Sequence, residues 1–432
     1  MSDNSSGTSL SKGKLGTAGI VFFVVAAAAP LLGMTGAVPV AMFLGNGAGA
    51  SGTYLAVGLL LALFAVGYSA MSQKVTNTGA FFAYVGRGLG RNAGVASAFA
   101  SIVGYVTIQL AIYGFFGGVM SFMVPGLPWY GWALVAWAVA TLLSLFSVDI
   151  GSKVLGVLMI LEVLALVVTA VAILVQNAGS IDFIAAFSPD AILAGGVTGT
   201  AGIAIAFAFA SFIGFEATAI YGEESKDPKR SVAKATYWAI GLITGLFAIV
   251  SLAMSTAMAS YSNPNAPEGF PNEGLYGYIA EFGGLDPAIG LTNPAGVLQH
   301  MADVSLGGTW MSTIMGYLVL TSCFAGILAF QNAISRYFFA MGRGGILPAS
   351  FGNTNNSGAP KNGVILTSVL ALVIMIGFAA AGLDGIGNLF TWMSAITAVA
   401  IMFVEVLVSI AIMVYLRKDG TFNIWKSTIA PL

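Results

Sequence analysis

Apolar stretches long enough to cross a bilayer follow one another along nearly the whole chain. A helix that spans a hydrocarbon core of about 30 Å needs about 20 apolar residues. Charged residues make up 8% of the 432 residues, against about 25% in soluble domains, so the chain cannot cover itself with water-facing side chains. The sequence predicts an all-α polytopic membrane protein with ten spans, near 15–43, 52–73, 93–123, 129–148, 154–176, 199–221, 235–260, 306–332, 363–382 and 388–416.

The distribution of basic residues predicts how these spans are oriented in the membrane. With ten spans and alternating loops, all 16 Lys and Arg residues fall on one side of the predicted membrane. The opposite side carries acidic residues, such as Asp182, Glu273 and Asp384, and no basic residue. Because Lys and Arg accumulate in cytoplasmic loops, the N-terminus and Lys418 are predicted to be cytoplasmic, in a multi-pass protein of the plasma (inner cell) membrane.

Glycine and proline interrupt two of the spans. Pro30, Gly33, Gly36 and Pro39 lie within the first span, and the segment 211–216 (SFIGFE) lies within the sixth. Irregular backbone at membrane depth is tolerated where it is buried in protein or lines a cavity. Paired interrupted helices in corresponding positions of two halves point to the binding site of a transporter. The alternative is that these residues only kink tightly packed helices.

Three carboxyl groups, those of Glu162, Glu216 and Glu405, lie inside predicted spans. A charge at the bilayer centre costs at least about 2.5 kcal/mol, so each group should face a cavity or a partner. Glu162 and Glu405 occupy the fifth and tenth spans, which would be counterparts in two five-span repeats, like the interrupted first and sixth. All three are candidates for proton coupling. The alternative is a neutral, hydrogen-bonded structural carboxyl, which we favour for Glu216.

These observations predict a 5+5 inverted repeat with the following organisation. Residues 1–14 form a disordered cytoplasmic N-terminus, 15–176 the first repeat, 177–198 an external linker, 199–416 the second repeat with an external lid at 261–305, and 417–432 a cytoplasmic tail or the start of an eleventh span. Within the lid, Asn293-Pro294 should cap a short helix. Its apolar face should carry Val297, Leu298, Met301 and Val304.

Four motifs in order resemble those of the amino acid–polyamine–organocation (APC) superfamily of permeases. They are GAFFAYV at 79–85, SFIGFE at 211–216, GEESKDPKR at 222–230 and SRYFFAMGRGGILP at 335–348. The resemblance implies a LeuT-type fold, amino acid uptake or exchange commonly coupled to protons, and twelve spans in the intact protein. Two departures stand out. The first-helix interruption reads Gly33-Met34-Thr35-Gly36-Ala37, and Glu162 replaces the lysine of many proton-coupled relatives.

An interrupted helix suits a zwitterionic amino acid. Freed N–H groups and the positive end of a half-helix attract the carboxylate, and freed carbonyls accept hydrogen bonds from the ammonium. The predicted substrate-binding residues are Gly33, Met34, Thr35 and Gly36 for the carboxylate, and Phe209, Ala210, Ser211, Phe212, Ile213 and Gly214 around the ammonium and side chain. Tyr105 and Gln109 on the third span are candidates to line the pocket.

The sequence therefore predicts a secondary active amino acid transporter that works by alternating access, is proton-coupled and favours neutral substrates. Thr321 and Ser322 are weaker candidates for a sodium site. The alternatives are a polyamine or organic-cation permease, an amino acid exchanger, and, from another class, a transporter-like receptor or channel. One histidine, His300, and one cysteine, Cys323, leave no metal cluster. No nucleophile–base constellation indicates an enzyme, and neither a cofactor nor a nucleic-acid partner is expected.

Overall fold

The computed structural model describes residues 17–75, 79–146, 152–196, 199–220, 225, 227–420 and 423–431. The predicted disordered segment 1–14 lies outside these residues, as do residues 222–224 and 226 of the motif at 222–230. The described chain is almost entirely helical, and its strands form one short antiparallel pair.

Long helices make up most of the described chain. They are α4 (Ala50–Ser72), α6 (Arg91–Met123), α7 (Trp129–Leu145), α8 (Ser152–Gln176), α13 (Pro228–Met258), α16 (Trp310–Arg343), α17 (Lys361–Ala380) and α18 (Thr391–Lys418). Within the described residues, eight helical segments are long and apolar enough to cross a membrane. One of them, Pro30–Ser72, contains parts of both the first and second predicted spans, and α7 is a shorter apolar helix. The all-α polytopic class is confirmed, whereas the count of ten spans stays a prediction.

The two predicted interrupted spans are each built from short pieces. The first contains α1 (Thr17–Ala28), α2 (Pro30–Leu32), the π-helical turn η1 (Gly33–Ala37), α3 (Val38–Val40), η2 (Ala41–Asn46) and η3 (Gly47–Gly49). The second contains α11 (Ala201–Phe212) and α12 (Ala217–Ile220). A further π-helical turn, η7 (Gly385–Phe390), leads into α18.

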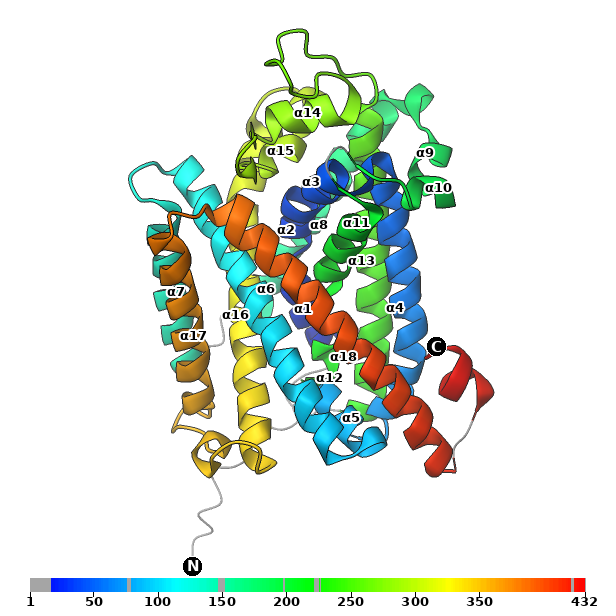
Figure 1. The fold of residues 1–432 in the computed structure, drawn as a ribbon, viewed down its shortest axis with the longest axis vertical. Coiled ribbons are helices and arrows are strands. Elements are labelled where there is room, and N and C mark those ends of the chain that lie inside the picture. Colours follow the sequence, from blue (N-terminus) through cyan, green and yellow to red (C-terminus); the bar gives the residue numbers. More distant parts are fainter. Residues whose placement is uncertain are drawn as a thin grey trace, which may run out of the picture.

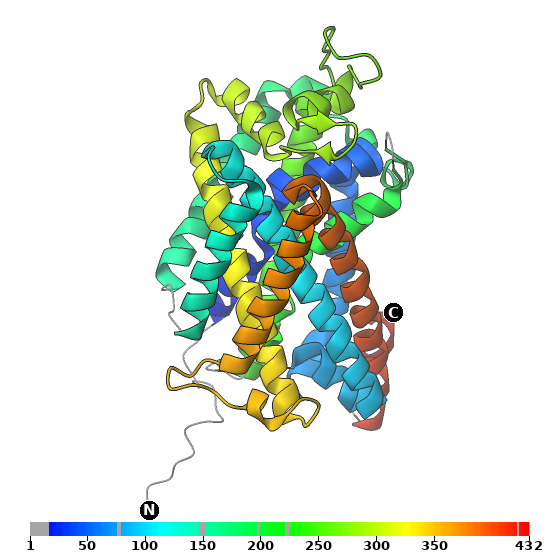
Figure 2. The same ribbon diagram turned by 60° about the vertical axis from the view of Figure 1, so that its left-hand side comes forward.

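These pieces lie at the centre of the bundle, and the long helices surround them (Figure 1). Helices α4 and α13 pack side by side, α6 packs against α16 and α18, and α7 and α17 form one edge (Figures 1 and 2). Small residues allow the closest crossings, as is usual between membrane helices. A side chain at Gly58 on α4 would collide with Thr244 on α13, and one at Gly88 would collide with the backbone of Ala411 on α18.

The two ends of the bundle differ. One end, which we call the lid face, carries α14 (Gly274–Phe282), β1 (Leu285–Asp286), β2 (Gly290–Leu291) and α15 (Ala295–Leu306), at the top of Figure 1. The other end, the α5 face, carries α5 (Ala80–Leu89) and the turn η6 (Ala349–Gly352). The smaller elements are η4 (Ala178–Ser180), α9 (Phe183–Phe187), α10 (Pro189–Ile192) and η8 (Trp425–Ile429).

The short helix predicted after Asn293-Pro294 is confirmed as α15. Val297, Leu298 and Met301 are buried on its inner face. Val304 follows them at helical spacing but is 67% exposed.

Candidate functional site

The helix of the first predicted span breaks at Ala29, directly before Pro30, and the expected segment Gly33–Ala37 is a π-helical turn and not the break itself. Helix α1 ends at Ala28, Ala29 adopts a left-handed conformation with φ +43°, and Pro30 begins α2. Proline has no N–H and disfavours α geometry in the preceding residue, which places the break directly before it. The Gly33 N–H donates to the Ala29 carbonyl at 3.0 Å, so the glycines continue a helix.

The second interruption lies within the predicted segment, which is confirmed as irregular. Helix α11 ends at Phe212, Ile213 is extended with ψ 132°, and Gly214 has φ +116°. The Gly214 N–H donates to the Glu216 carboxylate at 2.9 Å, and the Tyr68 hydroxyl donates to the Glu216 backbone carbonyl at 2.7 Å. The side chain and backbone of Glu216 therefore both stabilise this turn, which fits the structural role favoured from the sequence.

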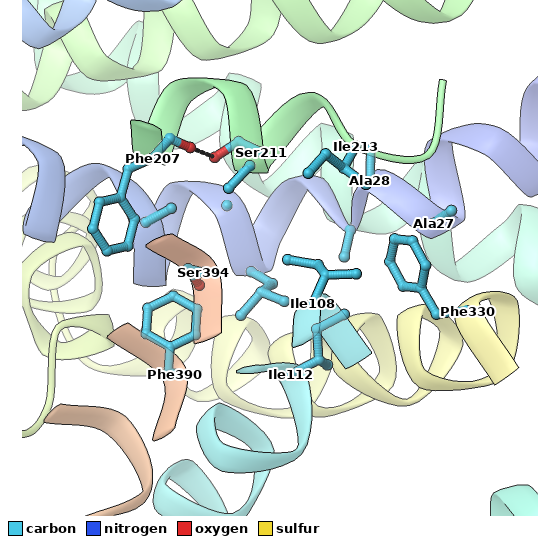
Figure 3. A pocket seen from close by; sticks show the side chains of 15 residues that line it. Ala27, Ala28, Ile108, Ile112, Phe207, Ser211, Ile213, Phe330, Phe390 and Ser394 are labelled. Atoms are coloured by element: carbon cyan, nitrogen blue, oxygen red, sulfur yellow. Dashed lines mark hydrogen bonds between the residues drawn. The ribbon is translucent and has the colours of Figure 1, made fainter. Parts of the chain in front are cut away.

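The two interruptions touch each other and enclose a small cavity (Figure 3). A Cβ atom added at Gly214 would lie 2.9 Å from the Cβ of Ala27. The cavity has a volume of about 30 Å³, which is room for one water molecule. An amino acid is larger, so substrate entry requires the surrounding helices to move apart.

The cavity is lined almost entirely by apolar groups from five parts of the chain. The lining residues are Ala27, Ala28, Ala29, Leu32, Gly33, Ala37, Ile108, Ile112, Phe207, Ala210, Ser211, Ile213, Phe330, Phe390 and Ser394. None of them is charged. The Ser211 hydroxyl donates to the Phe207 carbonyl at 2.7 Å and pairs with the Tyr54 hydroxyl at 3.1 Å. The Ser394 hydroxyl makes no hydrogen bond with a described residue and is available to a ligand.

Four of the ten predicted substrate-binding residues line this cavity, namely Gly33, Ala210, Ser211 and Ile213. Thr35 is fully buried, and its hydroxyl donates to the Leu31 carbonyl at 2.6 Å. Phe212 packs against Phe247 with ring centroids 6.0 Å apart. Phe209 faces a different groove, which it shares with Glu405 on α18. Met34 and Gly36 are buried without lining the cavity, and Gly214 lies beside it at the contact with Ala27.

The third predicted span lines the cavity with other side chains than the predicted Tyr105 and Gln109. Gln109 donates to the Gln331 side chain at 2.7 Å, away from the cavity, and the ring of Tyr105 packs against Tyr337 at 5.3 Å. Ile108 and Ile112, one turn apart on the same helix α6, line the cavity instead. Phe330 on α16, and Phe390 and Ser394 at the start of the tenth span, were also not predicted. The sequence offered no signal for them beyond their place on spans expected to contribute.

Aromatic side chains close the cavity at both ends. Phe207 and Phe390 lie at one end, 6.2 Å apart between ring centroids, and Phe330 lies at the other (Figure 3). Gly387, in the same turn as Phe390, packs against Ile289 of the lid, so the first end points toward the lid face. Toward the α5 face, Phe64, Tyr68, Phe81 and Phe215 form a buried aromatic layer with centroid distances of 5.7–6.3 Å. The structure is therefore closed toward both faces.

Glu162 joins the first interruption to two long helices. Its side chain is 4% exposed on α8 and accepts a hydrogen bond from the Ser322 hydroxyl on α16 at 2.7 Å. The Leu31 backbone N–H, in the first turn after the break, faces the same carboxyl group. The neighbouring sodium candidate Thr321 donates to the Leu318 carbonyl within its own helix at 2.9 Å. Among the described residues, no group of three His, Cys, Asp or Glu side chains could hold a metal ion.

Comparison with known protein families decides the family. The family model of amino acid permeases, described as "Amino acid permease", matches residues 24–429. The chain belongs to the amino acid permease family. This permease is 24% identical over 380 residues to the branched-chain amino acid permease BcaP of Lactococcus lactis, covering 83% of this chain and 73% of that protein. It is 21% identical over 402 residues to the aromatic amino acid transport protein AroP of Salmonella typhimurium, covering 90% and 80%.

Solved structures support the fold of this permease. The crystal structure of a manganese transporter from Eremococcus coleocola matches with a TM-score of 0.57 and 13% sequence identity, covering 100% of this chain and 90% of that chain. At this identity the likeness concerns the fold alone. The LeuT-type, APC-like fold implied by the sequence motifs is thereby confirmed.

Proposed function

We propose that this permease is a secondary active transporter of neutral amino acids with apolar side chains, which works by alternating access in the plasma membrane with its N-terminus in the cytoplasm. The observation that carries the proposal is the uncharged cavity enclosed by the two helix interruptions. Membership of the amino acid permease family supports amino acid transport. The names of the branched-chain and aromatic relatives agree with apolar substrates.

Backbone groups at the interruptions suit the common part of an amino acid. Helix α11 ends at Phe212, and the last carbonyls of a helix have no partner within it. The Ala210 and Phe212 carbonyls accept long hydrogen bonds, at 3.3 Å, from the N–H groups of Ile213 and Phe215. A carbonyl oxygen can accept a second hydrogen bond, so the carbonyls of the segment 209–212 are proposed to accept from the substrate ammonium. The first turn after Pro30 carries the positive end of a helix, which is proposed to attract the substrate carboxylate to the side of the cavity lined by Gly33.

Side chains on the opposite wall determine what else fits. Ile108, Ile112 and Phe330 are apolar, and Ser394 is the polar group on that side. A charged substrate side chain would be buried there without a partner, which is strongly unfavourable. The same reasoning disfavours the polyamine alternative, because Glu216 does not line the cavity and accepts from the Gly214 N–H, and Glu405 faces another groove.

Glu162 is the residue that we propose to couple transport to protons. Its carboxyl group accepts a hydrogen bond from Ser322 on α16 and faces the Leu31 N–H at the start of the second half of the first interrupted helix. Protonation would remove the negative charge that strengthens both interactions. Loading and releasing a proton would therefore change how firmly α2 is held against α8 and α16. An amino acid exchanger without proton coupling remains the second candidate function.

Transport in proteoliposomes tests the proposal. Labelled leucine should accumulate, and unlabelled isoleucine or phenylalanine should compete with it, whereas aspartate, lysine and putrescine should not. Ile112→Trp fills the cavity and should abolish uptake, whereas Ile249→Trp, at a position on α13 that is 52% exposed, should not. Competition by putrescine but not by isoleucine would overturn the proposed substrate class. Absence of transport for every amino acid tested would favour the receptor alternative.

A further inference from the structure

A second, larger cavity lies at the α5 face, apart from the central one. It has a volume of about 610 Å³ and is lined by residues of α5, the first turns of α6, the end of α18 and the turn that follows α16. Helices α5, α6 and α18 pack on one another around it, at the bottom of Figure 1. The positive-inside pattern predicts that this face is cytoplasmic.

Positive charge dominates this cavity. Its lining contains Lys74, Arg87 and Arg91 and no acidic residue. Lys74 is paired with Asp419 at 3.0 Å. Arg87 and Arg91 are exposed, and neither side chain makes a hydrogen bond or an ion pair with a described residue. Two guanidinium groups therefore face a roomy cavity without a counter-charge from the described chain.

The cavity continues into an apolar surface along α6. Val95 lines the cavity one turn after Arg91. Phe99 and Val103 follow on the same side of the helix, because residues four apart lie above one another, and they are 49% and 48% exposed. Since α6 is one of the membrane-spanning segments, this row of side chains faces the lipid. The basic side chains at the membrane surface therefore adjoin an exposed apolar row, Val95, Phe99 and Val103, which we call the apolar track.

We propose that this cavity is a binding site for an anionic phospholipid. Arg87 and Arg91 bind the phosphate group, because guanidinium groups donate paired hydrogen bonds to phosphate oxygens. One acyl chain lies along Val95, Phe99 and Val103. The first turn of α6, whose N-terminus has no side-chain cap, adds a favourable partial charge. Anionic lipids are enriched in the cytoplasmic leaflet and attract basic residues near its surface.

A soluble anion is the competing occupant, and the apolar track argues against it. Free phosphate would use the two arginines and leave Val95, Phe99 and Val103 without a role. A bound lipid would contact α5, α6 and α18 together, and should therefore stabilise the packing of these helices. Stabilisation by a lipid is measured without transport, so its test is independent of the test of the proposed substrate.

Thermal unfolding of the full chain in detergent, with lipid added, tests the site. Dioleoylphosphatidylglycerol should raise the midpoint of unfolding, whereas dioleoylphosphatidylcholine and inorganic phosphate at equal concentration should not. In the double variant Arg87→Gln/Arg91→Gln, the apparent affinity for phosphatidylglycerol should fall about 25-fold, at about fivefold for each charge. Both arginines are on the surface, so the variant should fold. The double lysine variant keeps the charge but not the paired hydrogen bonds, and its affinity should lie between those of the wild type and the double glutamine variant.

Lys361→Gln is the matched control, because Lys361 is exposed at the same face outside the cavity. It should bind phosphatidylglycerol like the wild type. Equal stabilisation by phosphatidylcholine would overturn the proposal, and so would unchanged phosphatidylglycerol binding by the double glutamine variant. Equal stabilisation by inorganic phosphate would show that the occupant is a soluble anion, which also overturns it.

Discussion

Glu162 is the residue with the most direct structural link to helix movement. In Glu162→Gln the amide oxygen can still accept from the Ser322 hydroxyl, but the side chain can no longer take up a proton. We expect accumulation of leucine driven by a pH gradient to be lost in proteoliposomes, whereas leucine–leucine counterflow, which needs no net proton movement, is retained.

Glu405→Gln is the control for this prediction. Glu405 is buried on α18 and makes no hydrogen bond to a described residue of either interruption. It should keep gradient-driven accumulation. The coupling role of Glu162 would be refuted by accumulation that persists in Glu162→Gln, or by its loss in Glu405→Gln alone.

Gly214 tests the geometry of the second interruption. Its φ of +116° is rarely adopted by residues with a side chain, and a Cβ would lie 2.9 Å from that of Ala27. Gly214→Ala should cost about 1–3 kcal/mol of stability and sharply reduce leucine uptake. In Gly241→Ala on α13, where no atom lies within 4 Å of the added Cβ, both should stay near wild type. Equal unfolding midpoints for the two variants would contradict the strain argument.

At this scale the sequence was least informative. Glycine and proline indicate that the first span is interrupted, but the break lies at Ala29, directly before Pro30, and not at the glycines. On α6, Gln109 does not line the cavity. A buried amide needs partners, and Gln331 satisfies it away from the cavity. Which face of a uniformly apolar helix turns inward depends on its neighbours, which a single sequence does not show.

At the scale of elements, α14 and α15 pack on each other at the lid face and are joined by a polar contact of His300. The ring of His300 on α15 stacks on Phe282 at 3.6 Å, and its Nδ1 lies 2.6 Å from the Tyr278 hydroxyl. Burial lowers the pKa of His300 from its usual 6.5, and the nearby carboxylates of Asp303 and Glu281 oppose this shift only in part. The folded pair therefore favours the neutral imidazole.

The sign of the pH effect follows from this shift. Above pH 6.5 the His300 ring is neutral both in the folded α14–α15 pair and in its locally unfolded state, so the interaction of His300 with Phe282 and Tyr278 stabilises the pair fully. Below that value the locally unfolded state binds the proton more readily than the folded pair. The free energy of local unfolding of α14 and α15 therefore falls as the pH falls. Hydrogen exchange in 261–305, corrected for intrinsic rates, should therefore accelerate between about pH 7.5 and about pH 5.5. His300→Gln should weaken this dependence, and an unchanged dependence in that variant would assign it to another group.

Element type was the part most accessible from the sequence, because long apolar runs leave few alternatives in a membrane. The lid was harder. Proline at 294 correctly indicated the start of α15, but α14 and the strand pair were not predicted, since the loop is short of strong periodic signals. Val304 follows the helical spacing of its apolar neighbours and still points outward. It lies in the last turn of α15, which ends at Leu306.

For the whole molecule, closure toward both faces implies that transport needs an opening movement. Cys323, the one cysteine of the chain, provides a reporter for it. It is fully buried on α16, next to Ser322 and close to Glu162. Helix α1 packs against α16, α8 and α13. If α1 swings away from these helices toward the α5 face, Cys323 should become accessible to a thiol reagent such as N-ethylmaleimide.

Tyr68→Phe should increase that accessibility. The Tyr68 hydroxyl donates to the Glu216 carbonyl and so ties α4 to the second interruption within the aromatic layer. Losing this buried bond should weaken the closed state by about 1–3 kcal/mol, and about 1.4 kcal/mol changes a population tenfold. Labelling of Cys323 should therefore become about tenfold faster. Tyr113→Phe, whose hydroxyl is buried without a hydrogen-bond partner, should label at the wild-type rate. Equal rates in the two variants would mean that opening does not pass through this layer.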